Sequence, residues 1–245
     1  MTSLRFEAIT FDYWNTLIAE DHSRHDRQVA AWQAELSEAG YSVTVEQVQQ
    51  SFAEAWKAYE QRWEANVQTR FVDIVEVVLG ALEIRADSET VEHLVAIQAN
   101  LAAEQEMPLI DGVEKVLAEL IDRGVRIGIV CDVGVTPSPV LRTRLERNGV
   151  LESFDHWSFS DEVGVYKPDR RIFEHAMAGL EMTDASRMAH VGDLRRTDIA
   201  GARGMGMTSV RFRGVVDDPV TDENPHEGDH VIDRHDQLLN ALGLV

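Results

Sequence analysis

Residues 9 to 18 of the chain read ITFDYWNTLI, an apolar run that leads to a single carboxylate, Asp12. The run from Phe6 to Phe11 is short and rich in apolar residues, and polar residues follow it, so we predict a buried strand that ends at Asp12. Two residues later, where a second carboxylate would be useful for proton transfer, the chain has Trp14. The chemistry of this stretch therefore depends on the side chains that the rest of the chain brings to Asp12.

Residues 21 to 106 form a segment of dense charge with few glycines, and their apolar side chains recur at helical spacing. We predict four helices with short connections, at about residues 22–39, 44–65, 68–83 and 88–104. A helical insert therefore follows the first strand.

After Met107 the pattern changes to strands that alternate with helices. The predicted strands span residues 126–131, 156–159, 188–191 and 208–212, with a further short strand at 231–232. Strands joined by single helices run parallel, with right-handed crossovers. The chain is therefore predicted to have an α/β fold built on a parallel sheet.

The composition limits the partners and the compartment. With 23 Lys plus Arg against 43 Asp plus Glu, the formal net charge of −20 repels nucleic-acid phosphate and anionic lipid, so we expect no nucleic acid and no membrane as partners. Part of this charge lies between Asp217 and Asp236, where eight carboxylates and a single arginine predict a solvated acidic loop.

Cys131 is the single cysteine, which excludes an internal disulfide and a cysteine-based zinc site. We find no signal-like or membrane-length apolar segment and predict a cytoplasmic protein.

Polar side chains follow several of the predicted strands. They are Asp12, Cys131, Asp132, Lys167 and Asp193, with Asp198 further into the last of these loops. Sites in parallel sheets form beyond the carboxyl ends of the strands, so these groups are expected to meet there. Three carboxylates and one lysine favour a hard divalent cation with oxygen ligands, which lets an anionic phosphate approach an acidic pocket. Magnesium fits this donor set best.

Four segments together resemble the motifs of the haloacid dehalogenase superfamily, which consists mostly of phosphatases. In chain order they read FDYWNTL, RIGIVCD, EVGVYKPDRRIF and HVGDLRRTDIAGARGMGM. Each segment alone is a weak signal, but their order and their places at predicted strand ends make the resemblance strong. It implies a Rossmann-like parallel-sheet core, residues 1–17 and 107–245, with an inserted α-helical cap domain, residues 18–106. Caps of this kind close over small substrates and help to select them.

The resemblance also implies roles for individual residues. Asp12 would attack phosphorus and form an aspartyl-phosphate, and Lys167 would act with it as a catalytic residue. Substrate binding is implied for Thr16, Cys131, Asp132 and Lys167. Magnesium would be held by Asp12, the backbone carbonyl of Trp14, Asp193 and Asp198.

Two positions depart from the family pattern. Trp14 stands where the family has an aspartate that donates and accepts protons, so catalysis worth about 10²–10⁴-fold must come from elsewhere or be absent. Cys131 stands where the family has a hydroxyl that binds phosphate, and a thiol is a weaker donor. Asp132 could compensate as an acid. We therefore expect a hydrolase whose turnover is slow.

Three functions remain open from the sequence. The preferred one is a magnesium-dependent hydrolase of a small phosphorylated metabolite. The second is displacement at carbon, as in 2-haloacid dehalogenation, because dehalogenases of the superfamily carry an aromatic residue at the place of Trp14. The third is a catalytically degenerate binding protein. The expected partner is a small anionic substrate, and the sequence leaves a homodimer open.

Overall fold

The computed structural model describes residues 5–19 and 25–245. The chain divides into two compact units, one formed by Met1–Glu20, Met107–Asp132 and Leu145–Val245, and the other by Asp21–Glu106 and Val133–Arg144. The first unit is an α/β unit and the second is helical. Each is described by itself below.

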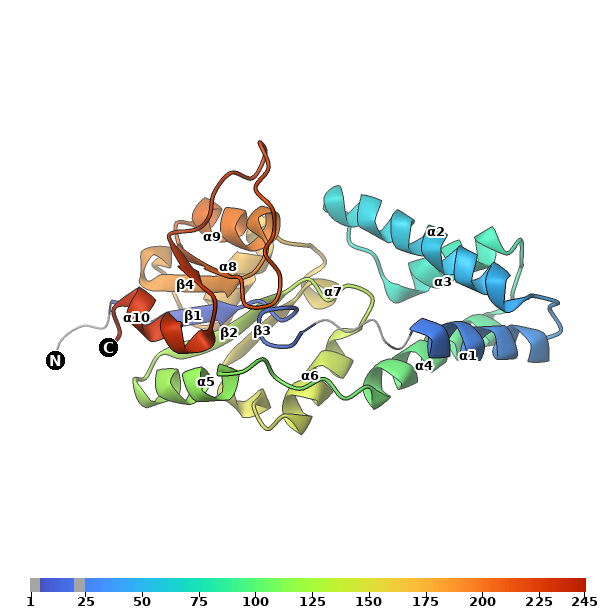
Figure 1. Ribbon diagram of the computed structural model, residues 1–245, viewed down its shortest axis with the longest axis horizontal. Coiled ribbons are helices and arrows are strands. Elements are labelled where there is room, and N and C mark those ends of the chain that lie inside the picture. The colour runs from blue at the N-terminus through green and yellow to red at the C-terminus, as the bar shows by residue number, and fades with distance from the viewer. Residues whose placement is uncertain (1–4, 20–24) are drawn as a thin grey trace. The chain divides into compact units, whose positions relative to one another are not determined.

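The described part of the α/β unit contains one six-stranded sheet in which every pair of neighbours is parallel (Figure 1). In chain order the strands are β1 (Ala8–Phe11), β2 (Arg126–Cys131), β3 (His156–Phe159), β4 (Met188–Gly192), β5 (Thr208–Phe212) and β6 (His230–Ile232). Their spatial order is β3-β2-β1-β4-β5-β6. The predicted α/β fold with a parallel sheet is confirmed.

The register of the central strands brings three strand ends together. Phe11, the last residue of β1, pairs with Ile129 on β2 and with Val191 on β4. The backbone N–H of Asp12 then donates to the carbonyl of Val191 over 2.8 Å. The first residue after β1 is therefore fixed at the carboxyl edge, beside the ends of β2 and β4.

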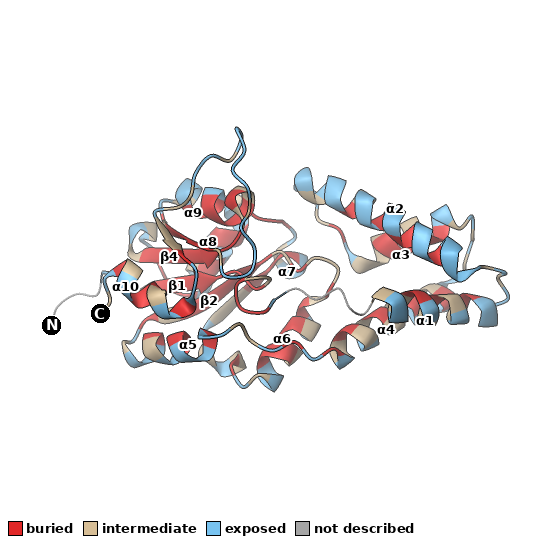
Figure 2. Ribbon diagram, viewed as in Figure 1, coloured by how far each residue is buried: buried red, intermediate tan, exposed pale blue. Residues whose placement is uncertain are grey.

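Helices cover both faces of the sheet. In chain order, the helices after the insert are α5 (Val113–Asp122), α6 (Ser138–Arg147), α7 (Ser160–Val163), α8 (Arg170–Gly179), α9 (Ala200–Met205) and α10 (Leu238–Leu242). Most of α6, up to Arg144, belongs to the helical unit. Figure 1 shows α8 and α9 on one side of the sheet and α5 and α10 on the other. The face under α8 and α9 is apolar: Ile172 and Phe173 of α8 pack with Val130 of β2 and Met188 of β4. The strands are accordingly almost wholly buried (Figure 2).

The helical unit contains α1 (His25–Glu38), α2 (Val45–Glu64), α3 (Phe71–Ala81) and α4 (Ser88–Glu104), close to the four predicted helices. Residues 22–24 of the first predicted helix lie outside the described residues. The core of this unit includes Trp32, whose ring meets the edge of the Phe52 ring at 4.7 Å. Nowhere in residues 5–19 and 25–245 is a helix long and apolar enough to span a membrane.

The acidic segment after β5 is attached to the sheet by two buried arginines. Arg211, on β5, forms ion pairs with the carboxylates of Asp217 and Glu227. Arg195 also pairs with Glu227, and its backbone N–H donates to Asp218 over 2.7 Å. The loop therefore remains largely exposed, as expected, while Asp217 and Glu227 also offset the charge of the buried guanidinium groups.

Candidate active site

The loop after β1 is a tight turn that holds Asp12 at the sheet edge. The N–H of Leu17 donates to the carbonyl of Tyr13 over 2.9 Å, and the N–H of Asn15 donates to the carbonyl of Ile18 over 2.7 Å. Asn15 has a φ of 54°, in the left-handed region that asparagine tolerates better than most residues. The chain thus turns back immediately after Asp12, which is 5% exposed.

The loop after β4 presents two more carboxylates. Asp193 follows the strand directly, and Asp198 lies in the π-helical turn Arg195–Ile199. The Asp198 carboxylate accepts the N–H of Leu194 over 3.0 Å, which closes the turn on itself. A Cβ atom on Gly192 would lie 2.3 Å from Cγ of Asp198, so only glycine lets this carboxylate approach the strand end.

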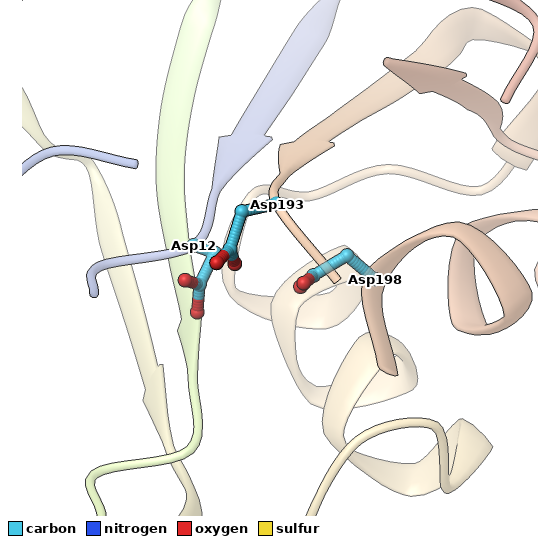
Figure 3. Close-up of side chains that lie close together, drawn as sticks. All are labelled: Asp12, Asp193 and Asp198. Carbon is cyan, nitrogen blue, oxygen red and sulfur yellow. The ribbon is translucent and has the colours of Figure 1, made fainter. Parts of the chain in front are cut away.

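The carboxylates of Asp12, Asp193 and Asp198 lie together (Figure 3). One ligand oxygen from each lies within 4.8 Å of the others, and all three residues are buried. Buried carboxylates at this distance repel one another strongly unless a cation offsets their charge. Hard oxygen donors in this number are what a divalent cation such as Mg²⁺ takes from a protein. The donor set therefore fits a hard divalent cation.

Lys167 supplies one positive charge to this cluster. Its side chain is 2% exposed, and its Nζ donates to Oδ1 of Asp198 over 2.6 Å and also to Oδ1 of Asp12. The backbone N–H of Lys167 donates to Oδ1 of Asp132 over 2.8 Å, which ties the lysine to the end of β2. The carboxylate of Asp132 thus places the backbone from which the ammonium group reaches the site.

The pKa values show that one lysine does not balance three carboxylates. Burial, together with the charge of Asp198, raises the pKa of Asp12 to about 7 against the pull of Lys167. Burial and the charge of Asp12 raise the pKa of Asp193 well above its usual range. Burial acts in the same sense on Asp198, but Lys167 and a neighbouring histidine hold its pKa below the ordinary value. Burial opposes the charge of Lys167, but the carboxylates hold the pKa of its ammonium group above the ordinary value. Further positive charge would therefore stabilise the ionised forms of Asp12 and Asp193.

The sequence model of the haloacid dehalogenase-like hydrolase family matches residues 6–206. The chain belongs to this family. The match includes all four residues of the charged cluster, Asp12, Lys167, Asp193 and Asp198.

Individual relatives of this hydrolase carry different names. It is 27% identical over 250 residues to haloacid dehalogenase-like hydrolase domain-containing protein 3 of Bos taurus, covering 98% of this chain and 94% of the relative. It is 36% identical over 104 residues, 42% of each protein, to a glyceraldehyde 3-phosphate phosphatase of Pyrococcus abyssi. A solved structure of 2-haloacid dehalogenase from Pseudomonas syringae pv. Tomato DC3000 superposes with a TM-score of 0.69 at 22% identity, covering 98% of this chain and 99% of that one. At that identity the last match shows the shared fold alone.

Three further residues of the hydrolase that were predicted to contribute to the site have different surroundings. Trp14 is half-buried, and its ring meets the ring of Tyr13 edge-on at 4.9 Å. Thr16 is buried, and its Oγ1 has no hydrogen-bond partner among the described residues. Cys131 ends β2 fully buried, and burial raises the pKa of its thiol well above the usual range. A role for Thr16 or Cys131 in substrate binding stays a prediction.

Two buried histidines near the site were missed by reasoning from the sequence. Nε2 of His190 lies 3.0 Å from Oδ1 of Asp198. Nε2 of His235 lies 2.7 Å from the carbonyl oxygen of Thr16, and its ring stacks on Phe212 at 4.4 Å. His190 is the first residue of the motif HVGDLRRTDIAGARGMGM, three residues before Asp193. This position could have indicated a residue close to the site. The contact of His235 with Thr16 joins residues 219 positions apart in the sequence, so no local pattern predicts it.

The pKa of Asp12 predicts how the stability of the metal-free protein depends on pH. The unfolded carboxyl group ionises near 3.8, whereas the folded one keeps its proton up to about 7. Between these values the folded state binds more protons, so Asp12 lowers the free energy of unfolding as the pH rises from about 4 to about 7. Urea unfolding in EDTA, at about pH 5 and about pH 8, should show the wild type losing stability relative to Asp12→Asn at the higher pH. A difference between the two proteins that does not change with pH would contradict this account.

Proposed function

We propose that this hydrolase is a magnesium-dependent phosphatase that acts on a small phosphorylated metabolite through Asp12. The observation that carries the proposal is the buried cluster of three carboxylates and one lysine at the carboxyl edge of β1 and β4. A nucleophilic carboxylate, an ammonium donor and an oxygen donor set for a hard cation are the groups that phosphoryl transfer needs.

The relatives support phosphate rather than halide chemistry. The Pyrococcus abyssi relative, whose name is that of a phosphatase, is similar to this chain in sequence. The dehalogenase structure shares the fold at an identity that carries no information about the reaction. The paired carboxylates of Asp193 and Asp198 favour a bound cation, which neutralises the charge of an incoming phosphate.

In the proposed reaction, a carboxylate oxygen of Asp12 attacks the phosphorus atom of the substrate. The bond to the leaving oxygen breaks, and an aspartyl-phosphate forms. Water then attacks the phosphorus atom, which releases phosphate and restores the carboxylate. Lys167 donates to Asp12, so its ammonium group lies where it also neutralises charge on the transferred phosphoryl oxygens.

Magnesium would be held by Asp12, Asp193, Asp198 and the backbone carbonyl of Trp14. When bound, it supplies the positive charge that offsets both the carboxylates and the phosphoryl group. The raised pKa values of Asp12 and Asp193 support this, because an additional cation would stabilise their ionised forms.

Trp14 has a direct consequence for the rate in this proposal. It stands two residues after the nucleophile and has no titratable group, whereas an aspartate there would both give and take a proton. Leaving groups that depart without a proton, such as acyl and aryl phosphates, are therefore favoured. Breakdown of the phosphoenzyme is slow, because no side chain at this position activates the water.

The remaining parts of the chain fit the same proposal. From the sequence we assign residues 1–17 and 107–245 to the catalytic core and residues 18–106 to a helical cap that selects the substrate. Thr16, Cys131 and Asp132 are proposed to contact the substrate. The net charge of −20 and the single cysteine suit a cytoplasmic enzyme of small anionic substrates with no nucleic-acid partner.

The proposal predicts a specific pattern of hydrolysis. The protein is assayed on acetyl phosphate, p-nitrophenyl phosphate, a sugar phosphate and 2-chloropropionate, each with Mg²⁺ and with EDTA. Phosphate release from the first two should require Mg²⁺, begin with a burst and vanish in Asp12→Asn. Halide release that survives EDTA would instead indicate displacement at carbon. Binding without turnover, unchanged in Asp12→Asn, would indicate a binding protein.

Replacing Trp14 tests the missing proton transfer. Trp14→Asp should speed hydrolysis of the phosphoenzyme by about 10²-fold, because an aspartate can activate the water. Trp14→Asn is the matched control, because asparagine has the same shape as aspartate but no titratable group. Single-turnover decay of the phosphoenzyme measures both variants. Equal decay rates in the two would place the slow step elsewhere.

A further inference from the structure

We propose that His190 is a positioning residue of this site: its imidazole fixes Asp198, and through Asp198 it fixes Lys167 against Asp12. His190 does not reach the substrate in this proposal. The inference deepens the proposed function and rests on it for the catalytic role of Asp198. The hydrogen bonds on which it is argued join protein side chains only and involve neither a metal ion nor a substrate.

His190 is held on every side. It lies on the central strand β4 with no exposed surface, and its ring meets the ring of Phe173 edge-on at 5.3 Å. Nε2 lies 3.0 Å from Oδ1 of Asp198, and Nδ1 lies 2.9 Å from Oγ1 of Thr10 on β1. Both ring nitrogens therefore have a defined partner, and one of these partners is a carboxylate of the site.

The contacts of the Asp198 carboxylate show which nitrogen of His190 donates to it. The carboxylate of Asp198 accepts from the ammonium group of Lys167 and from the N–H of Leu194, so it acts as an acceptor and Nε2 of His190 carries the proton. Nδ1 lies 2.9 Å from the hydroxyl oxygen of Thr10, which is also 3.4 Å from the carbonyl oxygen of Ala189. The donation that the proposal needs runs from Nε2 of His190 to Asp198.

These bonds leave the Asp198 carboxylate without freedom to rotate. Oδ1 accepts from His190 and from Lys167, and Oδ2 accepts from the N–H of Leu194 and the hydroxyl of Thr197. If the His190 bond is removed, Oδ1 keeps only the ammonium group of Lys167. That same ammonium group is the donor to Asp12.

The strand geometry explains why Thr10 is part of this arrangement. Thr10 and Asp12 are two residues apart at the end of β1, so their side chains leave the same face of the sheet. His190 is the register partner of Thr10 on β4. Thr10 therefore orients the imidazole from the strand that carries the nucleophile. Such outer partners of a site typically change cation affinity or activity by about 10–100-fold when they are removed.

Two amides of different length test the role of His190. Gln extends to the place of Nε2 and keeps a donor to Asp198, whereas Asn reaches only the place of Nδ1 and loses it. His190→Asn should lower kcat and weaken Mg²⁺ binding by about 10–100-fold, with a much smaller change in KM. His190→Gln should recover most of both. Mg²⁺ affinity is measured by calorimetry without substrate, and thermal unfolding checks that both variants fold. Equal losses in the two variants would overturn the proposal.

The proton on Nε2 of His190 can be measured directly in the wild-type protein. Nitrogen-15 NMR of the wild-type protein in EDTA should show His190 protonated at Nε2. Thr10→Val should shift the Nδ1 resonance, and Thr10→Ser should restore it. An Nε2 without a proton would overturn the inference even if the enzyme is an active phosphatase. If the NMR and Mg²⁺ results hold while no phosphate ester is hydrolysed, the proposed function fails and the positioning of Asp198 by His190 stands.

Discussion

The ammonium group of Lys167, shared between the buried carboxylates of Asp12 and Asp198, is the interaction on which the site depends. Without it, three carboxylates would be buried together with no positive charge. With it, one carboxylate is held ionised while the pKa values of Asp12 and Asp193 stay raised. The site thus fits a further cation, and Asp12 is held by the same bond that offsets part of its charge.

The fold supplies this arrangement through a few local devices. Parallel pairing brings the ends of β1, β2 and β4 to one edge, and Asn15 lets the chain turn directly after Asp12. Gly192 leaves room for Asp198, and Asp132 holds the backbone of Lys167. Each device is small, but together they remove the freedom that four charged side chains would otherwise use to separate.

The sequence predicted the parts of this structure that local patterns encode. Apolar runs and helical spacing gave the strands and helices, and polar residues after strands indicated Asp12, Lys167, Asp193 and Asp198. Contacts between distant segments could not be predicted in the same way. Arg211 binds Asp217 and Glu227 beneath a loop that composition alone suggested was solvated, and His235 reaches the carbonyl of Thr16 from the far end of the chain. Such pairings depend on which surfaces the tertiary fold brings together. The periodicity of apolar residues along the sequence does not predict this.

The central claim is that Asp12, Asp193 and Asp198 surround a single cation while Lys167 stays bound to Asp12. The most direct measurement is a crystal structure of the protein with Mn²⁺ in place of Mg²⁺, located by its anomalous scattering. The account predicts one strong peak within bonding distance of the carboxylates of Asp12 and Asp193. A site without such a peak at saturating Mn²⁺, or a peak elsewhere on the chain with Asp12 and Asp193 apart, would contradict it.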